Sequence, residues 1–248
     1  MPVYRLPEEI LFPPVELAEP EGLLAVGGDL SVERLAAAYE RGIFPWYSQD
    51  EPILWWSPDP RMALKPEGLH LPRSLKKSMR KGVYSITFDR AFSQVIDGCA
   101  QARTDGTWIT REMAAAYLRF HQAGFAHSVE AWRTGEDGVP VLAGGLYGVA
   151  LGGCFFGESM FSLQPDASKT AFAILVGRLA DWGFTLIDCQ VATDHLARFG
   201  AREIPRTTFL DLLGAALKTE VASAAWGTNP APTEQVPTSF QIPTDEPP

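Results

Sequence analysis

Cysteine is scarce in this sequence, which holds three cysteines among 248 residues. They stand at positions 99, 154 and 189, far apart and without any C-x-x-C spacing. An odd number of isolated cysteines argues against a disulfide framework, and the missing close pairs argue against a zinc site. We therefore expect three reduced thiols and no bound metal.

Long apolar runs and the common nucleotide motifs are also missing. Apolar stretches such as residues 171–176 are far too short to span a bilayer. The first residues lack the basic and apolar regions of a secretory signal, so we expect a cytoplasmic protein with no membrane partner. None of the patterns GxxxxGKS/T, HExxH, GxSxG and GxGxxG occurs, which disfavours nucleotide-binding, zinc-protease and serine-hydrolase functions. The sequence predicts no cofactor.

Positive charge is missing at both ends of the chain but gathers in the middle. The formal net charge is -9, yet residues 1–60 hold 11 acidic and three basic residues, and residues 219–248 hold four acidic and none. The stretch 61–218 is therefore net basic. Within it, residues 70–81 carry five cations and no acid, and the spacing of these cations places them on one helical face. Such a stripe suits phosphate contacts, although a solvated helix face is an equally good interpretation.

The chain divides into three parts. Residues 1–62 are rich in proline, glycine and aromatics and predict a small N-terminal domain, with one helix over 32–39 that starts after Ser31 and stops at Gly42. Residues 63–218 alternate strand and helix patterns and predict a larger domain. Residues 219–248 contain six prolines and no basic residue, which predicts a disordered tail to which we assign no function.

The larger domain combines two kinds of strand connection. Residues 126–132 and 141–148 predict a hairpin around a glycine-containing turn. A strand over 153–160, a helix from about 166 or 168 to 182 and a strand over 185–192 form a β-α-β unit, which implies a parallel pair. We therefore expect an α+β or mixed α/β fold with a mixed sheet. The other predicted elements are a strand at 84–88 and helices at 92–102, 112–123 and 208–218.

Two polar residues interrupt the apolar strand at 186–191. Residues two apart on a strand share a face, so Asp188 and Gln190 point the same way and Cys189 points the other way. Burying an acid and an amide is costly without partners, so they either serve a site or form a satisfied structural pair. The apolar neighbours of Cys189 favour an inert thiol and disfavour a Cys189–His195 dyad.

Glu158 is a second isolated polar residue. It stands in the run FFGESMF at 155–161, where aromatic side chains favour a pocket over a solvated surface. A carboxylate in such a setting is a good candidate to hold a cationic group.

Several runs together resemble one family. They are EGLLAVGGDLS at 21–31, RGIFPW at 41–46, WWSPDPR at 55–61, GTWIT at 106–110, GESMFS at 157–162, ASKT at 167–170 and LIDCQ at 186–190. In this order they are similar to the bacterial leucyl/phenylalanyl-tRNA–protein transferases, and the resemblance runs from about residue 10 to 215. It implies that the larger domain has the GNAT acyltransferase fold.

The resemblance also implies an activity and its partners. The enzyme would move Leu or Phe, and less well Met, from leucyl-tRNA or phenylalanyl-tRNA to the α-amine of proteins that begin with Arg or Lys. The product would enter N-end rule degradation. No metal or cofactor is implied.

The family's site residues fall on positions that the pattern analysis had singled out and on several others. The catalytic pair falls on Asp188 and Gln190. The acceptor site falls on Glu158 with Tyr39, Phe44, Trp46 and Trp108, where rings and a carboxylate suit a cation. The pocket for the transferred side chain falls on Leu146, Phe155, Met160, Phe172, Leu175, Leu179 and Ile187. The tRNA-binding patch falls on Arg73, Lys77, Arg80 and Lys81.

The implied reaction does not require a strong general base. An N-terminal α-amine has a pKa of about 7.7 to 8, so a useful fraction is neutral near pH 7. We hypothesise that Asp188 polarises Gln190, which positions the attacking amine. Most of the acceleration would then come from proximity and from stabilising the tetrahedral oxyanion.

Two alternatives remain at this point. A CoA-dependent GNAT acyltransferase would need an R/Q-x-x-G-x-G/A pyrophosphate loop, and the sequence lacks one. A non-catalytic module that binds the tRNA 3′ end or a degron would need only the basic stripe and Glu158, and the presence of Asp188 and Gln190 counts against it.

Overall fold

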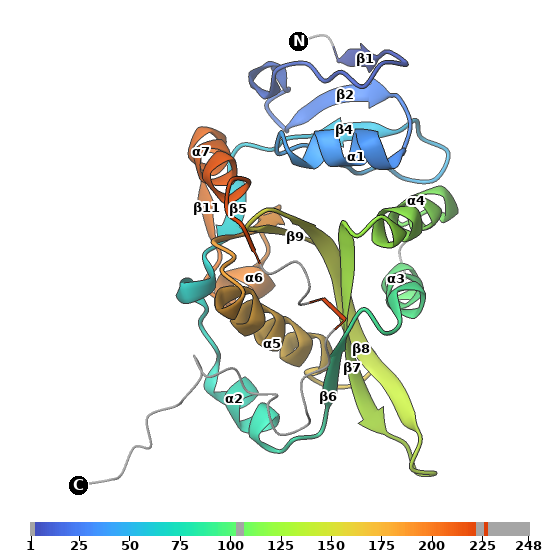
Figure 1. Ribbon diagram of the computed structural model, residues 1–248, viewed down its shortest axis with the longest axis vertical. Coiled ribbons are helices and arrows are strands. Elements are labelled where there is room, and N and C mark those ends of the chain that lie inside the picture. The colour runs from blue at the N-terminus through green and yellow to red at the C-terminus, as the bar shows by residue number, and fades with distance from the viewer. Residues whose placement is uncertain (1–2, 103–106, 222–225, 228–248) are drawn as a thin grey trace, which may run out of the picture.

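The computed structural model describes residues 3–102, 107–221 and 226–227. A small N-terminal sheet and its helix lie above a larger mixed sheet that has helices on both faces (Figure 1). This arrangement confirms the predicted α+β class with a small N-terminal unit. No helix in the described part of the chain is both long and apolar enough to cross a bilayer.

The N-terminal unit is a four-stranded sheet covered by one helix. Its strand order is β1 (Tyr4–Leu6), β2 (Leu23–Gly27), β4 (Leu54–Trp56) and β3 (Phe44–Pro45), and a 3-10 turn, η1, spans Val15–Leu17. Helix α1 (Val32–Tyr39) has the predicted bounds, and the Ser31 hydroxyl accepts a hydrogen bond from the backbone N–H of Arg34. The end of α1 carries Tyr39 toward the larger unit.

The larger sheet has seven strands. Their order is β11 (Arg202–Ile204), β5 (Arg61–Leu64), β10 (Leu186–Gln190), β9 (Cys154–Ser162), β8 (Pro140–Leu151), β7 (Ala126–Thr134) and β6 (Ser85–Phe88). The hairpin of β7 and β8 and the parallel pair of β9 and β10 both form as the sequence predicts. β5 begins at Arg61 and so crosses the expected domain boundary after residue 62.

Helices cover the two faces of the large sheet. α3 (Phe92–Gln101) and α4 (Arg111–Gln122) pack with the N-terminal unit into one apolar cluster. α5 (Ala167–Asp181), which joins β9 to β10, packs with α2 (Arg73–Arg80) into another. Figure 1 shows α3 and α4 on one side of the sheet and α5 on the other. Three smaller elements complete the unit: η2 (Pro66–Gly68), α6 (Asp194–Arg198) and α7 (Arg206–Ala216).

The parallel pair separates at the point where the polar residues begin. The pairing of β10 with β9 ends at Asp188 opposite Phe156, although β9 continues to Ser162. On its other edge, β10 shifts register against β5 between Asp188 and Gln190. Gln190 has a φ of 60°, a left-handed conformation that is uncommon for a residue other than glycine. The bulge redirects the end of β10 away from β9.

The structure differs from the predicted disordered tail at two residues. Val221 and Trp226 both pack against the apolar cluster on the α5 face of the sheet. The rest of that tail, apart from residues 219–221 and Gly227, lies outside the described residues.

Candidate active site

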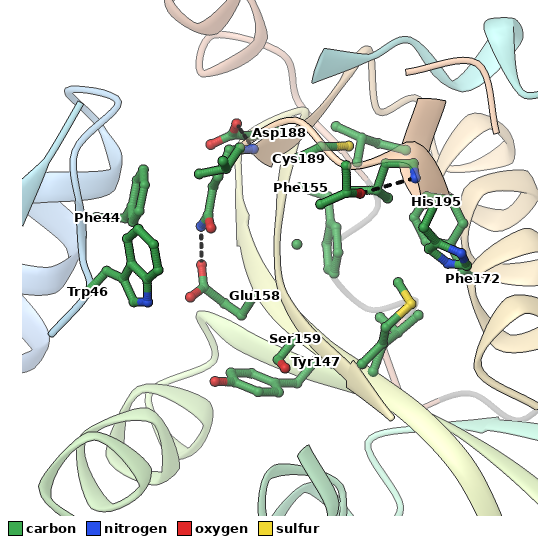
Figure 2. Close-up of a pocket in the computed structure, with 18 of the residues that line it drawn as sticks. Phe44, Trp46, Tyr147, Phe155, Glu158, Ser159, Phe172, Asp188, Cys189 and His195 are labelled. Atoms are coloured by element: carbon green, nitrogen blue, oxygen red, sulfur yellow. Dashed lines mark hydrogen bonds between the residues drawn. The ribbon is translucent and has the colours of Figure 1, made fainter. Parts of the chain in front are cut away.

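A cavity of ≈ 440 Å³ opens where β9 and β10 separate. Its wall combines β3 of the N-terminal unit, the middle of β8 and β9, the end of β10, and side chains from α5 and α6. Figure 2 shows Phe44, Trp46 and Glu158 at one end and His195 and Phe172 at the other, with the end of β10 above them. The cavity therefore joins a polar end to an apolar one.

Glu158 lies at the polar end, held by three hydrogen-bond donors. Its Oε1 accepts from the Tyr39 hydroxyl at 2.8 Å and from Gln190 Nε2 at 2.8 Å. Its Oε2 accepts from the Tyr117 hydroxyl at 3.0 Å. Burial raises the pKa of Glu158 to about 7, and the charge of Asp188 adds to this rise, while the three hydrogen bonds oppose it. The carboxyl has no cationic partner among the described residues, so it is suited to receive one from a ligand.

Tyr39 and Tyr117 form a neutral support beneath Glu158. Both side chains are fully buried, and their hydroxyls contact each other as well as the carboxylate. Burial, followed by the negative charge of Glu158, raises the pKa of both tyrosines, which keeps their hydroxyls protonated as donors. The sequence analysis missed Tyr117. Its only signal was its place on the buried face of the predicted helix, a feature it shares with ordinary core residues.

Asp188 forms a buried ion pair with Arg61, a residue that the sequence analysis also missed. Arg61 Nε lies 2.8 Å from Asp188 Oδ1 and Nη2 lies 2.6 Å from Oδ2, so the contact is bidentate. The two side chains are 1% and 0% exposed. The guanidinium also donates to the Gly42 carbonyl at 3.1 Å and is flanked by the rings of Phe44 and Phe209. The sequence offered one signal for Arg61, which is a single arginine at the start of an apolar strand.

Gln190 is positioned by its backbone and by its side chain. Its backbone N–H donates to Asp188 Oδ1 at 2.9 Å, and its Nε2 donates to Glu158 as described above. Asp188 and Gln190 both line the cavity, although the register shift between them interrupts the regular strand. The hypothesis that Asp188 polarises the side chain of Gln190 differs from the observed contact, because the carboxylate binds the backbone N–H of Gln190.

Cys189 follows the alternation pattern. It packs with Ile187 and Phe155 in the apolar cluster on the α5 face, away from the side on which Asp188 meets Arg61, as predicted. Together with Ile187 it also lines the cavity. Its thiol is half-buried, and burial with the charge of Asp188 raises its pKa. The thiol therefore stays protonated, which agrees with the expected lack of nucleophilic chemistry. Cys99, Cys154 and Cys189 are thiols and not disulfide partners.

The residues expected for an apolar side-chain pocket divide into two layers. Leu146, Phe155, Met160, Phe172 and Ile187 line the cavity, whereas Leu175 and Leu179 are fully buried and absent from its wall. At the polar end, Phe44, Trp46 and Trp108 line the wall, and Tyr39 contacts Glu158 from behind.

The apolar end includes side chains from α6 and the loop before it that the sequence analysis did not assign. Thr193, His195 and Leu196 line the cavity there. Burial, followed by the charges of Lys169 and Arg198, lowers the pKa of His195, so its imidazole is neutral near pH 7. Within the residues that the structure describes, no three His, Cys, Asp or Glu side chains gather in a way that could hold a metal ion.

The basic stripe lies on α2, which packs against α5. Arg73, Lys77, Arg80 and Lys81 are all exposed. None of these four side chains forms an ion pair with another residue in the ranges 3–102 and 107–221. The stripe is free to bind an external anion.

An apolar pocket, an amide and a carboxylate without a cationic partner among the described residues meet in one cavity, an arrangement suited to group transfer. Two family models match the chain. Residues 63–214 match "Leucyl/phenylalanyl-tRNA protein transferase", and residues 28–59 match "Leucyl/phenylalanyl-tRNA protein transferase N-terminal domain".

Curated relatives give the same result over almost the whole chain. A leucyl/phenylalanyl-tRNA--protein transferase of Anaeromyxobacter sp. (strain Fw109-5) is 61% identical, covering 91% of this chain and 95% of its own. Those of Magnetococcus marinus and Myxococcus xanthus are each 57% identical, covering 92% and 91% of this chain and 98% and 97% of their own. Among solved structures, L-PGS from Bacillus licheniformis shows a TM-score of 0.37 at 13% identity, over 66% of this chain and 55% of that chain.

The chain belongs to the leucyl/phenylalanyl-tRNA–protein transferase family. It is therefore an aminoacyltransferase whose donor is an aminoacyl-tRNA. Family membership decides against the CoA-dependent and the non-catalytic alternatives.

Proposed function

We propose that the enzyme transfers Leu or Phe, and less efficiently Met, to the α-amine of proteins that begin with Arg or Lys, which marks them for N-end rule degradation. The observation that carries this proposal is Glu158, a carboxyl without a cationic partner among the described residues, at the polar end of an otherwise apolar cavity. Aminoacyl-tRNA is a cytoplasmic molecule, which supports a cytoplasmic location.

The acceptor's first side chain binds at Glu158. A guanidinium or ammonium group donates a charge-assisted hydrogen bond to the carboxylate and gains cation–π attraction from nearby rings. Trp46 and Trp108 line that end of the cavity, and Trp46 is 43% exposed, so an entering polypeptide can reach it. A first residue without a cation would leave the buried carboxylate unpaired, which disfavours its binding.

The donor's side chain occupies the apolar end. Leu146, Phe155, Met160, Phe172 and Ile187 supply aliphatic and aromatic surface without a charge. A Leu or Phe side chain buried there holds its ester carbonyl near the end of β10. Leu175 and Leu179 support this wall from the second layer.

The reaction is then an attack of the neutral α-amine on that carbonyl. The new peptide bond forms as the ester bond breaks, and the amine proton passes to the departing 3′-terminal ribose oxygen of the tRNA. Because Gln190 commits Nε2 to Glu158, its Oε1 is the group available to accept a hydrogen bond from the amine. Asp188 and Arg61 hold the backbone of Gln190 in place and take no proton.

A transfer assay tests this function directly. Labelled leucine on leucyl-tRNA is offered to a peptide that starts with Arg, beside the same peptide starting with Gly and an acetyl-CoA control. We expect label on the Arg peptide alone. Equal labelling of both peptides would contradict the assigned acceptor specificity, and acetylation without leucine transfer would contradict the assigned donor.

The stripe on α2 supports binding of the tRNA. Changing both Lys77 and Arg80 to Ala is expected to raise KM for aminoacyl-tRNA about tenfold at moderate salt, with kcat unchanged. The slope of log KM against log salt should become shallower by about 1 to 2, since two phosphate contacts are lost. Lys218→Ala, at an exposed site beyond α7, serves as the matched control. An unchanged salt slope in the double variant would place the tRNA elsewhere.

A further inference from the structure

Trp226 is held in a cluster of rings although the chain around it has the composition of a tail. Its ring stacks on His127 with centroids 4.0 Å apart and an interplanar angle of 9°. It meets Trp182 edge-on at 5.0 Å and stacks with Phe155 at 6.0 Å. Phe88 and Phe184 complete the cluster. The family model ends at residue 214, before this anchor.

The cluster has a fixed shape. His127 Nδ1 lies 2.7 Å from Asp89 Oδ2, which sets the orientation of the imidazole under Trp226. His127 belongs to β7, Phe88 to β6 and Phe155 to β9, while Trp182 ends α5. Trp226 therefore packs between the sheet and the end of α5.

One ring of this cluster is also a wall of the active-site cavity. Phe155 lines the apolar end of the cavity and is 1% exposed, so almost none of its surface meets solvent. Its contacts include both the cavity and the indole of Trp226. Protein interiors are close-packed, so a void beside Phe155 would let its ring move away from the cavity.

We propose that Trp226 is a positioning residue that determines donor specificity by fixing the ring of Phe155 and hence the depth of the side-chain pocket. This inference rests on the proposed function, because it takes the apolar end as the donor pocket. With Trp226 in place, the pocket has the depth that accepts Leu. Without it, the pocket deepens and the larger Phe side chain gains relative to Leu.

The test measures kcat and KM for leucyl-tRNA and phenylalanyl-tRNA with one Arg-starting peptide, in the full-length protein. Trp226→Ala is expected to raise the ratio of kcat/KM for Phe over Leu about three- to tenfold, since small changes of pocket size carry discrimination of this order. Trp226→Phe should keep most of the original ratio. Phe240→Ala, at the other aromatic residue of the tail, and a deletion of residues 228–248 should leave the ratio unchanged.

Each other outcome has a definite meaning. An unchanged ratio in Trp226→Ala, or an equal loss for both donors with a lower melting temperature, would overturn the inference and leave Trp226 as a support of the fold. If Trp226→Ala does not fold, a deletion of residues 222–248 decides: a raised ratio of Phe over Leu supports the inference, and an unchanged ratio overturns it. Failure of the unaltered enzyme to transfer either amino acid would instead refute the proposed function, and the specificity role of Trp226 would fall with it.

Discussion

Replacing Asp188 with asparagine is expected to lower kcat by about 10²-fold or more, with KM for aminoacyl-tRNA changed by less than about threefold. Asparagine keeps one oxygen for the backbone N–H of Gln190 but turns an amide NH₂ toward the guanidinium of Arg61. Arg61 is then left with a buried and unmatched charge, and the backbone N–H of Gln190 exchanges a charged acceptor for a neutral one, which weakens the contact that holds its left-handed backbone. Rapid-quench kinetics with saturating tRNA measures the chemical step.

The same change should lower the free energy of unfolding by about 3–5 kcal/mol, the usual loss when one partner of a buried ion pair is removed. Arg61→Lys is the matched control, because it keeps the charge but loses the bidentate contact. We expect a smaller fall in both kcat and melting temperature for it. A loss of tRNA affinity in folded Asp188→Asn protein, parallel to the loss of rate, would refute the positioning role of Asp188.

Replacing Glu158 with glutamine is expected to reduce kcat/KM for an Arg-starting peptide by about 10²- to 10³-fold. Removing one partner of a buried charge pair typically costs about 2–5 kcal/mol of binding. Glutamine has nearly the same shape, so Tyr39 and Tyr117 keep a neighbour of similar size, and KM for aminoacyl-tRNA should stay the same. Glu158→Asp retains the charge at a shorter reach and should lose less. Unchanged acceptor kinetics in Glu158→Gln would show that the cation binds elsewhere.

The pH profile gives this prediction a second readout. Below about pH 7 the carboxyl of free Glu158 is protonated and cannot pair with a cation, so acceptor kcat/KM should rise as pH passes through 7. Glu158→Gln should keep only the rise that comes from the acceptor's own amine. The raised pKa also means that the folded free enzyme binds a proton that the unfolded chain has lost between pH 4.5 and 7. Glu158 therefore makes the unaltered enzyme less stable as pH increases over that window, and the variant should lack this contribution.

The sequence predicted those parts of the site that depend on local pattern. Period-two alternation identified Asp188 and Gln190, and an isolated carboxylate among aromatics identified Glu158. The roles of Arg61 and Tyr117 were not predicted, because each depends on a partner far along the chain. Arg61 precedes Asp188 by 127 positions, and Tyr117 precedes Glu158 by 41. Local periodicity in the sequence does not predict contacts between residues so far apart.

The errors have the same origin. Strand alternation assumes an unbroken pleat, and the register shift after Asp188 brings the backbone N–H of Gln190, and not its side chain, to the carboxylate. Composition placed Trp226 in a tail because proline and acidic residues surround it. The rings that hold Trp226 lie on β6, β7, β9 and near the end of α5, so only the folded sheet brings them together.

The bond between Arg61 and the Gly42 carbonyl joins the end of α1 to the ion pair on β10. Tyr39, Phe44 and Trp46 bring the N-terminal unit to the polar end of the same cavity, where we propose that the acceptor binds. The two units are thus halves of one binding surface. A chimaera that takes its N-terminal unit from a relative would change the residues at the polar end of the cavity and the contact from Gly42 to Arg61 at the same time. A change of acceptor preference by domain exchange therefore requires both units to be redesigned together.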